Sequence, residues 1–535
     1  MSTRPLARAS FELRTDAISS FLGILLEDIL LPNDHIQDGA LLYLFNETDS
    51  KKSQIWVFMN QEKFLTNYNY EVGQDFGIEG RPASWAGSEK SAHCFWNDED
   101  DSTRIPIDAT GPMSTSITGI SHDEKFIAVS SGLAVVVFDL ETQKVCTEFK
   151  GLTVRCANLN FSPVHSESGG YTLVVGDSDL GEQQQIILFL NLDKSGRWTD
   201  EPEDLDWGLL LELSLEPVRS EMDAVYGRGS TRQLMKPVRE DYKIILQKLQ
   251  SNIKSKDLVR VNGLIGHFGS KPFSADGRFL LYLVHNQSTQ QGMRPPEELP
   301  HVVVYDIVNH TEKHVLGGHQ DAIMWTDFSP DGQYVATASW DGTFRIFEVD
   351  SGDCKHVIGP TGGQCWTGAW SPDSKHILLC GMAHQDGEGR PEVFVAVYSV
   401  EKAQQINRFD HTRLNDWVRN VAWSETGAIA FAHKTEVFVW EPFENRVIST
   451  FALKVESFML RGFAGIRDVE WVQEGDVLIA YTGDGTIEVW NWRQNAKWRV
   501  QRPHGLVQSR RAWWMEKQKA IVSVDGEGIM RFYRL

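Results

Sequence analysis

The stretch Gly318–Val349 reads GHQDAIMWTDFSPDGQYVATASWDGTFRIFEV, and its pattern decides the fold. Side chains alternate from Tyr334 to Ser339 as they do along a half-buried strand. Asp341-Gly342 follows directly and is a strong signal for a tight hairpin. The stretch therefore predicts short antiparallel strands joined by tight turns.

The same plan recurs along the chain from about residue 115 onward. Each unit has an apolar strand that ends in an aromatic residue, a turn, and two strands separated by a tight turn. The clear copies end their first strands at Phe328, Trp370, Trp423, Trp471 and Trp514. More degenerate copies lie near Ile117, Phe161 and Phe273. The spacing of ~40–50 residues is typical of propeller blades and favours eight units, with seven units and an irregular remainder as the alternative.

The clearest unit carries three local marks, which are Gly318-His319, Ser339-Trp340-Asp341 and Phe347-Glu348. Partial versions occur later, at Trp440-Glu441 and at Thr482-Gly483-Asp484 with Trp490-Asn491. With these marks the chain resembles the WD-repeat β-propeller family, with Phe347 in place of the family's tryptophan. The resemblance implies an all-β fold, a propeller of seven or eight four-stranded blades over residues 115–535. It implies little about function, because this architecture is a platform for many activities.

Residues 1–114 do not follow the repeat and are predicted to form an N-terminal extension. The apolar spacing over residues 16–30 predicts an amphipathic helix there. The last unit supplies only three strands, so a strand from the extension is expected to complete the ring and remove its free edges. The candidates for this closing strand are residues 41–45 and 54–58.

Residues 194–266 interrupt the repeats and are predicted to be a partly helical insertion. Apolar residues share one stripe over 238–253, which predicts a helix. The first half of the insertion is acidic and the second half is basic. Two interpretations of the basic half stay open, a solvated helix face and a docking element for an acidic partner.

The charge balance limits the classes of function. The 535 residues include 52 lysines and arginines against 73 aspartates and glutamates, a formal net charge of −21. Such an acidic chain is unsuited to general nucleic-acid or membrane-surface binding. None of the 6 cysteines forms a C-x-x-C pair, so neither a disulfide framework nor a zinc site is indicated. Without a signal-peptide pattern, a cytoplasmic or nuclear protein is expected.

Motifs of the common enzyme classes are missing from the sequence: it has no phosphate-binding loop, zinc-protease motif or nucleophile elbow. We therefore predict no enzymatic activity, no cofactor, no metal and no small-molecule substrate. His319, Ser339 and Asp341 have the composition of a catalytic triad. The family resemblance instead implies that they form a buried hydrogen-bond network, with Asp484 and Trp490 in matching structural roles in a later unit.

The strongest functional signal is a repeated position, one residue after the start of a first strand. Successive units carry there Met324, Trp366, Arg419, Arg467 and Arg510, with Arg511 beside the last. Because first strands line the channel of a propeller, these side chains are expected to converge on one face, together with Trp340. Arginine pairs with carboxylate or phosphate through two parallel hydrogen bonds, so this face is predicted to bind partners.

The leading hypothesis is a non-enzymatic scaffold that binds other proteins, within a multi-subunit complex, through one propeller face and the insertions. The alternative is a reader of a phosphorylated or acidic ligand, a peptide rather than nucleic acid. Internal ion pairs to neighbours such as Asp416 and Asp468 would leave the arginines no role in binding. Many of the 18 tryptophans are expected to close strands, which leaves Trp340 and Trp366 as the surface candidates.

Overall fold

The computed structural model describes most of the repeat region and short parts of the N-terminal region. The described residues are 40–44, 55–59, 77–78, 81–82, 84–85, 102–106, 117–131, 133–152, 156–178, 185–199, 207–226, 234–246, 258–286, 295–385, 391–410, 414, 416–434, 436–452, 466–482, 487–492, 496–500, 512–524 and 528–534. The chain divides into two compact units, the larger being Tyr70–Lys454 with Ala464–Leu535 and the smaller Met1–Asn69 with Val455–Phe463.

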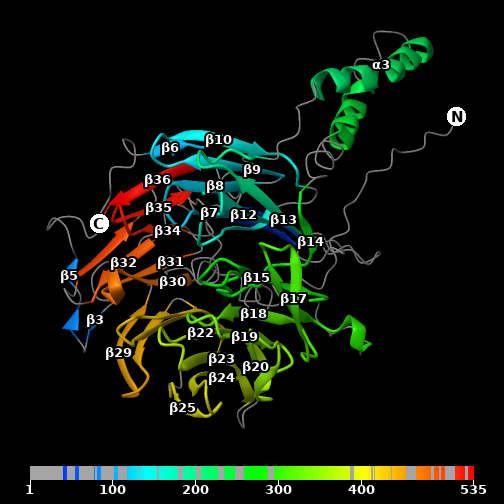
Figure 1. The fold of residues 1–535 in the computed structure, drawn as a ribbon. Coiled ribbons are helices and arrows are strands. Elements are labelled where there is room, and N and C mark those ends of the chain that lie inside the picture. The colour runs from blue at the N-terminus through cyan, green and yellow to red at the C-terminus, as the bar shows by residue number, and fades with distance from the viewer. Residues whose placement is uncertain are drawn as a thin grey trace. The chain divides into compact units, whose positions relative to one another are not determined.

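In the larger unit, eight sheets of three to five described strands are numbered here as blades 1 to 8 (Figure 1). A separate two-stranded sheet pairs β3 (Gly77–Ile78) with β4 (Arg81–Pro82). Blade 1 comprises β7 (Ile117–Ile120), β8 (Phe126–Ser131), β9 (Ala134–Asp139) and β10 (Lys144–Phe149). Blade 2 comprises β11 (Cys156–Phe161), β12 (Tyr171–Ser178), β13 (Gln185–Leu192) and β14 (Arg260–Asn262). Blade 3 comprises β15 (Phe279–Val284), β16 (His301–Asp306) and β17 (Thr311–Leu316). Blade 4 comprises β18 (Ile323–Phe328), β19 (Tyr334–Ser339), β20 (Phe344–Glu348) and β21 (Cys354–Ile358).

The second half of the ring repeats this plan. Blade 5 comprises β22 (Gly362–Trp370), β23 (His376–Gln385), β24 (Pro391–Ser399) and β25 (Gln405–Arg408). Blade 6 comprises β26 (Val418–Trp423), β27 (Ile429–His433), β28 (Glu436–Glu441) and β29 (Arg446–Ala452). Blade 7 comprises β30 (Ile466–Val472), β31 (Val477–Thr482), β32 (Ile487–Asn491) and β33 (Ala496–Val500), with β5 (Ser84–Trp85) added in parallel. Blade 8 comprises β34 (Ala512–Met515), β35 (Ala520–Val524), β36 (Ile529–Arg534) and β6 (Ser102–Arg104).

Eight blades confirm the predicted all-β propeller and its larger blade number. The first strand of a blade is innermost, and β18, β22, β26 and β30 lie next to one another in that order (Figure 1). Tight turns make the antiparallel connections. In blade 4 the hairpin after β19 uses Gly342 at φ 82°, a backbone conformation that glycine adopts without steric cost.

Neighbouring blades pack through apolar side chains, because a single four-stranded sheet cannot bury both of its faces. Within blade 4, Phe328 packs towards blade 3 and Trp325 towards blade 5. The predicted closing aromatics also join blades by hydrogen bonds. The Trp370 indole N–H donates to Asp327 O at 3.3 Å, and the Trp471 indole N–H donates to Ala422 O at 3.2 Å.

The last blade is completed by β6, which pairs antiparallel with β36. Ile105 follows β6, donates its N–H to Gly528 O at 2.8 Å, and is buried among residues of blades 1 and 8. The expectation of an N-terminal closing strand is confirmed, but both predicted segments are wrong. In the smaller unit, β1 (Ala40–Leu44) pairs with β2 (Ile55–Met59). These apolar strands therefore form backbone hydrogen bonds with each other and not with the last blade. The short polar β6 has no strand pattern of its own.

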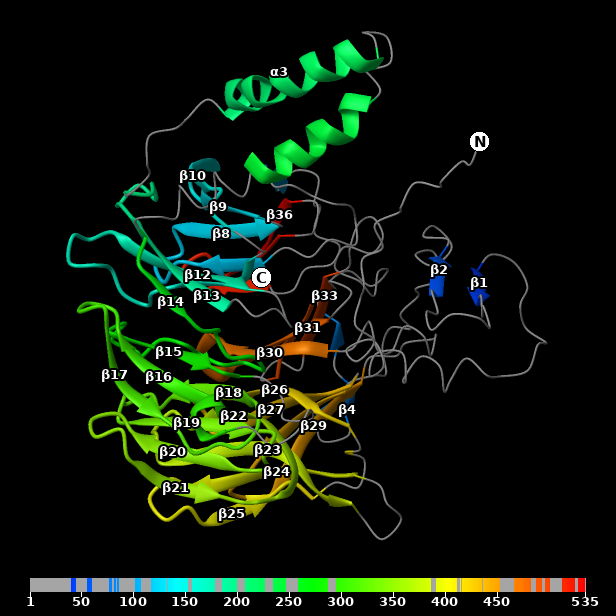
Figure 2. The same cartoon turned by 90° about the vertical axis from the view of Figure 1, so that its right-hand side faces the viewer.

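The described part of the insertion contains two helices, and the insertion joins β13 to β14 and so belongs inside blade 2. They are α3 (Trp207–Tyr226) and a second helix over 234–246, side by side in Figure 2. The predicted start at residue 238 is wrong, because Pro237 is tolerated in the first turn of a helix. The predicted helix over 16–30 lies outside the described residues. No helix in the described part of the chain is both long and apolar enough to cross a membrane.

Candidate functional site

The inner strands of five blades carry a β-bulge, and in four of them the bulge lies at a position that the sequence singled out. Ladder pairing skips one residue there, which is Ala157, Met324, Trp366, Arg419 or Arg467. A bulge leaves its extra residue unpaired and re-aims the side chain. These positions therefore share one backbone geometry at one end of the ring, called here the channel face.

The side chains at these positions do not all reach the surface. Trp366 is only 1% exposed, so the prediction that it is a surface residue is wrong. Met324 and Trp340 are half-buried. The side chains of Arg419 and Arg467, and all of Arg510 and Arg511, lie outside the described part of the structure. The convergence of the arginines stays a prediction.

Trp417 is the aromatic residue that the channel face exposes where Trp366 was expected. Its exposed fraction is 37%, and its ring stacks on the Trp366 ring with 5.7 Å between centroids and 24° between planes. Sequence reasoning missed it because it precedes the inner strand. Aligning Asp416-Trp417 with Asp321-Ala322 of blade 4 could have found it. In both blades the aspartate accepts the N–H of the next residue, at 2.8 Å from Trp417 and 2.7 Å from Ala322. Trp417 thus takes the place of a buried alanine.

Blade 3 lacks a regular inner strand, and residues 265–272, called here the channel loop, take its place. Leu264 pairs with Leu283 and Phe273 pairs with Leu280, so the loop bulges out opposite the middle of β15. Four hydrogen bonds join it to blades 4 and 5. The His267 N–H donates to Met324 O (3.1 Å) and the Lys271 N–H to Thr326 O (3.2 Å). In the other direction, the Thr326 N–H donates to Ser270 Oγ (3.0 Å) and the Thr367 hydroxyl to Phe268 O (2.8 Å). The loop therefore lies against the inner strands of its neighbours, on the channel side.

The tip of the channel loop is a tight turn with a bulky residue in it. The Ser270 N–H donates to His267 O at 3.0 Å, and the two central residues, Phe268 and Gly269, have φ values of 49° and 81°. Two positive φ angles define a type I′ turn, which favours Asn and Gly. For phenylalanine such a conformation is a genuine outlier. The turn places the Phe268 ring edge-on to Trp417, with centroids 6.0 Å apart.

The carboxylates of Asp416, which precedes Trp417, and of Asp468 on the next inner strand both have partners. Asp416 lies 3.9 Å from the Lys434 ammonium, both side chains being about half exposed. Asp468 accepts a hydrogen bond from the side-chain amide of Asn420. Burial and the Lys434 charge lower the pKa of His433 to about 4, so this ring is neutral at physiological pH.

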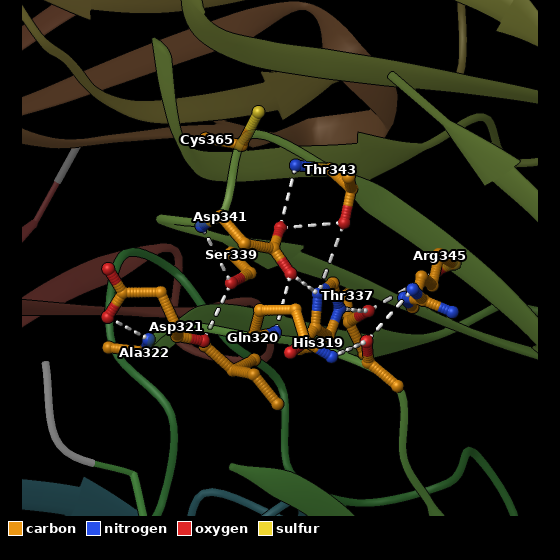
Figure 3. A network of polar contacts seen from close by, with 12 residues as sticks. His319, Gln320, Asp321, Ala322, Thr337, Ser339, Asp341, Thr343, Arg345 and Cys365 are labelled. Carbon is orange, nitrogen blue, oxygen red and sulfur yellow. Dashed lines mark hydrogen bonds and ion pairs between the residues drawn. The ribbon is translucent and has the colours of Figure 1, made fainter. Parts of the chain in front are cut away.

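The predicted polar network of blade 4 is present and buried (Figure 3). His319 is 0% exposed, its Nδ1 lies 2.9 Å from Asp341 Oδ2, and its Nε2 lies 2.7 Å from Thr337 Oγ1. Since a carboxylate only accepts, the Nδ1–H donates to it and the threonine hydroxyl donates to Nε2. The Ser339 hydroxyl donates to Asp321 O at 2.7 Å. The network thus ties the hairpin to the loop before the inner strand.

The network fixes the protonation states of its members. Burial raises the pKa of Asp341, but hydrogen bonds from His319, Thr343 and the Gln320 N–H outweigh it and lower the pKa to about 2. Burial lowers the pKa of His319, so its ring is neutral. Of the matching residues in blade 7, Trp490 is buried on β32, and Asp484 lies outside the described residues.

Metal chemistry finds no support in the described residues. Nowhere in them do three or more His, Cys, Asp or Glu side chains form a group that could hold a metal ion. Burial raises the pKa of the Cys365 thiol to about 12 and that of Cys380 well above its ordinary value, so these thiols are poor nucleophiles.

Comparison with known proteins agrees with this geometry. Residues 310–348, which contain the network, match the family model described as WD domain, G-beta repeat. The chain is a WD-repeat β-propeller protein. Human coronin-7 is 34% identical over 86 residues, 16% of this chain and 9% of that protein. The WD repeat-containing protein 26 homolog of Arabidopsis thaliana is 28% identical over 170 residues, 31% of this chain and 28% of that protein.

The likeness to known proteins is local in sequence. WD repeat-containing protein 1 of Mus musculus is 36% identical over 69 residues, 12% of this chain and 11% of that protein. The matched parts of this chain thus cover between 9% and 28% of the length of these curated relatives. Among solved structures, a chain of the mitotic checkpoint complex matches with a TM-score of 0.42 and 11% identity, covering 81% of this chain and 94% of that chain. The computationally designed Ika8 protein matches with a TM-score of 0.48 and 12% identity, covering 81% of this chain and 100% of that chain.

Proposed function

We propose that this WD-repeat propeller is a non-enzymatic scaffold that binds other proteins through its channel face, within a multi-subunit assembly. Protein interaction is the role that the WD-repeat family supports, and it needs no reactive group. The thiols of Cys365 and Cys380 and the neutral, buried His319 are unsuited to nucleophilic or acid–base chemistry on an external substrate.

The observation that carries the proposal is the repeated bulge beside an exposed tryptophan. Bulges give five inner strands one backbone geometry at the same end of the ring. Trp417 lies at that end, fixed by stacking and still accessible. Tryptophan and arginine are the residues most often found at the energetic centres of protein interfaces.

The test is affinity purification of the full chain followed by quantitative mass spectrometry. The binding variant combines Arg419→Glu, Arg467→Glu and Arg510→Glu. The matched control combines Lys144→Glu, Lys375→Glu and Lys402→Glu, three exposed lysines that also change the net charge by six. We expect the arginine variant to lose the proteins that the wild type captures, and the control to keep them, with both variants unfolding at the wild-type temperature. Equal capture by all three proteins would contradict the proposal.

A further inference from the structure

We infer that the channel face binds an acidic peptide segment of a partner protein, whose apolar side chain packs on Trp417 and Phe268. The inference rests on the proposed scaffold function and goes beyond it by naming the chemistry of the partner and its anchor. Three sets of observations carry it: the aromatic platform, the channel loop and the charges around them.

The aromatic platform is held in place before any partner arrives. Trp417 is fixed by the buried Trp366 ring beneath it and by the edge of Phe268 beside it. An immobilised aromatic ring loses little conformational entropy on binding, which is the general advantage of a pre-organised site. A large apolar surface that is fixed and 37% exposed therefore favours an apolar side chain as its ligand.

The channel loop keeps Phe268 at this site against its backbone preference. A left-handed backbone is disfavoured for a non-glycine residue, and such strain is concentrated at functional positions. The Thr367 hydroxyl bond to Phe268 O holds the strained residue in place. Because the loop lies along the channel edge of β18, a ligand of the channel face has to lie across the end of the ring rather than on that edge.

The charges at this end of the ring select an acidic segment. Lys434 and Lys271 are exposed, and the bulge positions of blades 6 and 7 carry Arg419 and Arg467. The nearby Asp416 already contacts Lys434 and the Trp417 N–H. In a chain of net charge −21, the exposed Lys434 and Lys271 attract an acidic partner, which the acidic remainder of the surface repels.

The experiment is selection of peptides from a random dodecapeptide phage library on the immobilised full chain. Enriched peptides are synthesised with a fluorescein label and titrated by fluorescence anisotropy. The test variants are Trp417→Ala and Phe268→Gly, the second of which removes the ring but keeps a residue that suits the turn. The control is Phe443→Ala, which removes a 53% exposed aromatic from the turn between β28 and β29, at the opposite end of the ring.

We expect enriched peptides with several Asp or Glu residues around one apolar residue. Their affinity should fall about tenfold or more in both test variants, stay unchanged in Phe443→Ala, and weaken as salt concentration rises. A second pair is independent of the aromatic residues: Lys434→Glu should weaken the same peptides, and Lys375→Glu should not. This pair decides the question if Trp417→Ala does not fold.

Neutral or basic enriched peptides, no enrichment at all, or equal affinity for wild type and Trp417→Ala would each overturn the inference. The scaffold function is judged separately, by whether the wild type co-purifies proteins that the arginine variant loses. A chain that captures proteins but ignores acidic peptides would keep the proposed function and lose this inference.

Discussion

His319 and Asp341 show how single residues stabilise a blade. Both side chains are almost inaccessible to water, and each satisfies the other in a network that spans a hairpin and the loop before an inner strand. Removing one member leaves a buried donor without an acceptor, which costs more than the bond contributed. The effect of such a substitution on stability is therefore large for a single side chain.

Replacing Asp341 with alanine should lower the free energy of unfolding by ~1–3 kcal/mol, because the His319 Nδ1–H and the Gln320 N–H lose their acceptor. Thermal and urea unfolding followed by tryptophan fluorescence measure the effect. The matched control is Asp350→Ala, an aspartate that is fully exposed. Equal midpoints for the two variants would show that the network adds no stability.

Acid should erase the contribution of Asp341. Its pKa is about 2 in the folded protein against 3.8 when unperturbed, so its stabilisation is complete above about pH 4 and is lost as pH falls towards 2. The difference of nearly two units corresponds to about 2 kcal/mol. In urea titrations from pH 5 to pH 3, the gap between wild type and Asp341→Asn should narrow as pH falls. A gap that is constant over this range would contradict the assigned pKa.

Trp366 marks the limit of sequence reasoning at this scale. Its position after the start of an inner strand is equivalent to that of the arginines, and the bulge register confirms the equivalence of the backbone. The side chain nevertheless turns into the core, where Trp417 covers it. Position in a repeat predicts backbone geometry, whereas the direction of a side chain at a bulge depends on neighbours from other blades.

Among the elements, the channel loop departs most from the repeat. The degenerate copy near Phe273 indicated a blade there, but not that residues 265–272 leave the sheet. No periodicity in the sequence announces such a departure, because the loop is fixed by hydrogen bonds to blades that follow it in the chain.

The turn of this loop gives a direct test of its strain. Phe268→Gly and Phe268→Ala both remove the ring, but only glycine adopts a φ near 49° without cost. The glycine variant should therefore be more stable than the alanine variant by ~1 kcal/mol in urea unfolding. An alanine variant as stable as the glycine variant would mean that the turn is not of this type.

Ring closure is tested at the segment after β6. Ile105→Ala should lower the free energy of unfolding of the larger unit by ~2–5 kcal/mol, because it opens a cavity between blades 1 and 8. Val57→Ala in β2 is the control, since β2 pairs with β1 and not with the last blade. If Val57→Ala lowered the free energy of unfolding more than Ile105→Ala does, the strand over residues 54–58 would be the one that closes the ring.

For the whole molecule, much of the architecture was predictable and the site only in part. The repeat spacing of ~40–50 residues favoured eight blades over seven, and the structure has eight. The closing strand did not follow, because Ser102–Arg104 is too short and polar to show a strand period. Trp417 was missed because it lies in a loop, where no periodicity applies.

The chain as a whole is acidic, and its channel face exposes Trp417. We propose that partner proteins dock on the channel face. The most direct measurement places the photo-crosslinking amino acid benzoylphenylalanine at Asp416, beside Trp417, or at Val308, an exposed residue in the turn between β16 and β17 at the opposite end of the ring. After irradiation of the full chain in cell extract, cross-linked proteins should be recovered from position 416 and not from position 308. Recovery of the same proteins only from position 308 would contradict the account.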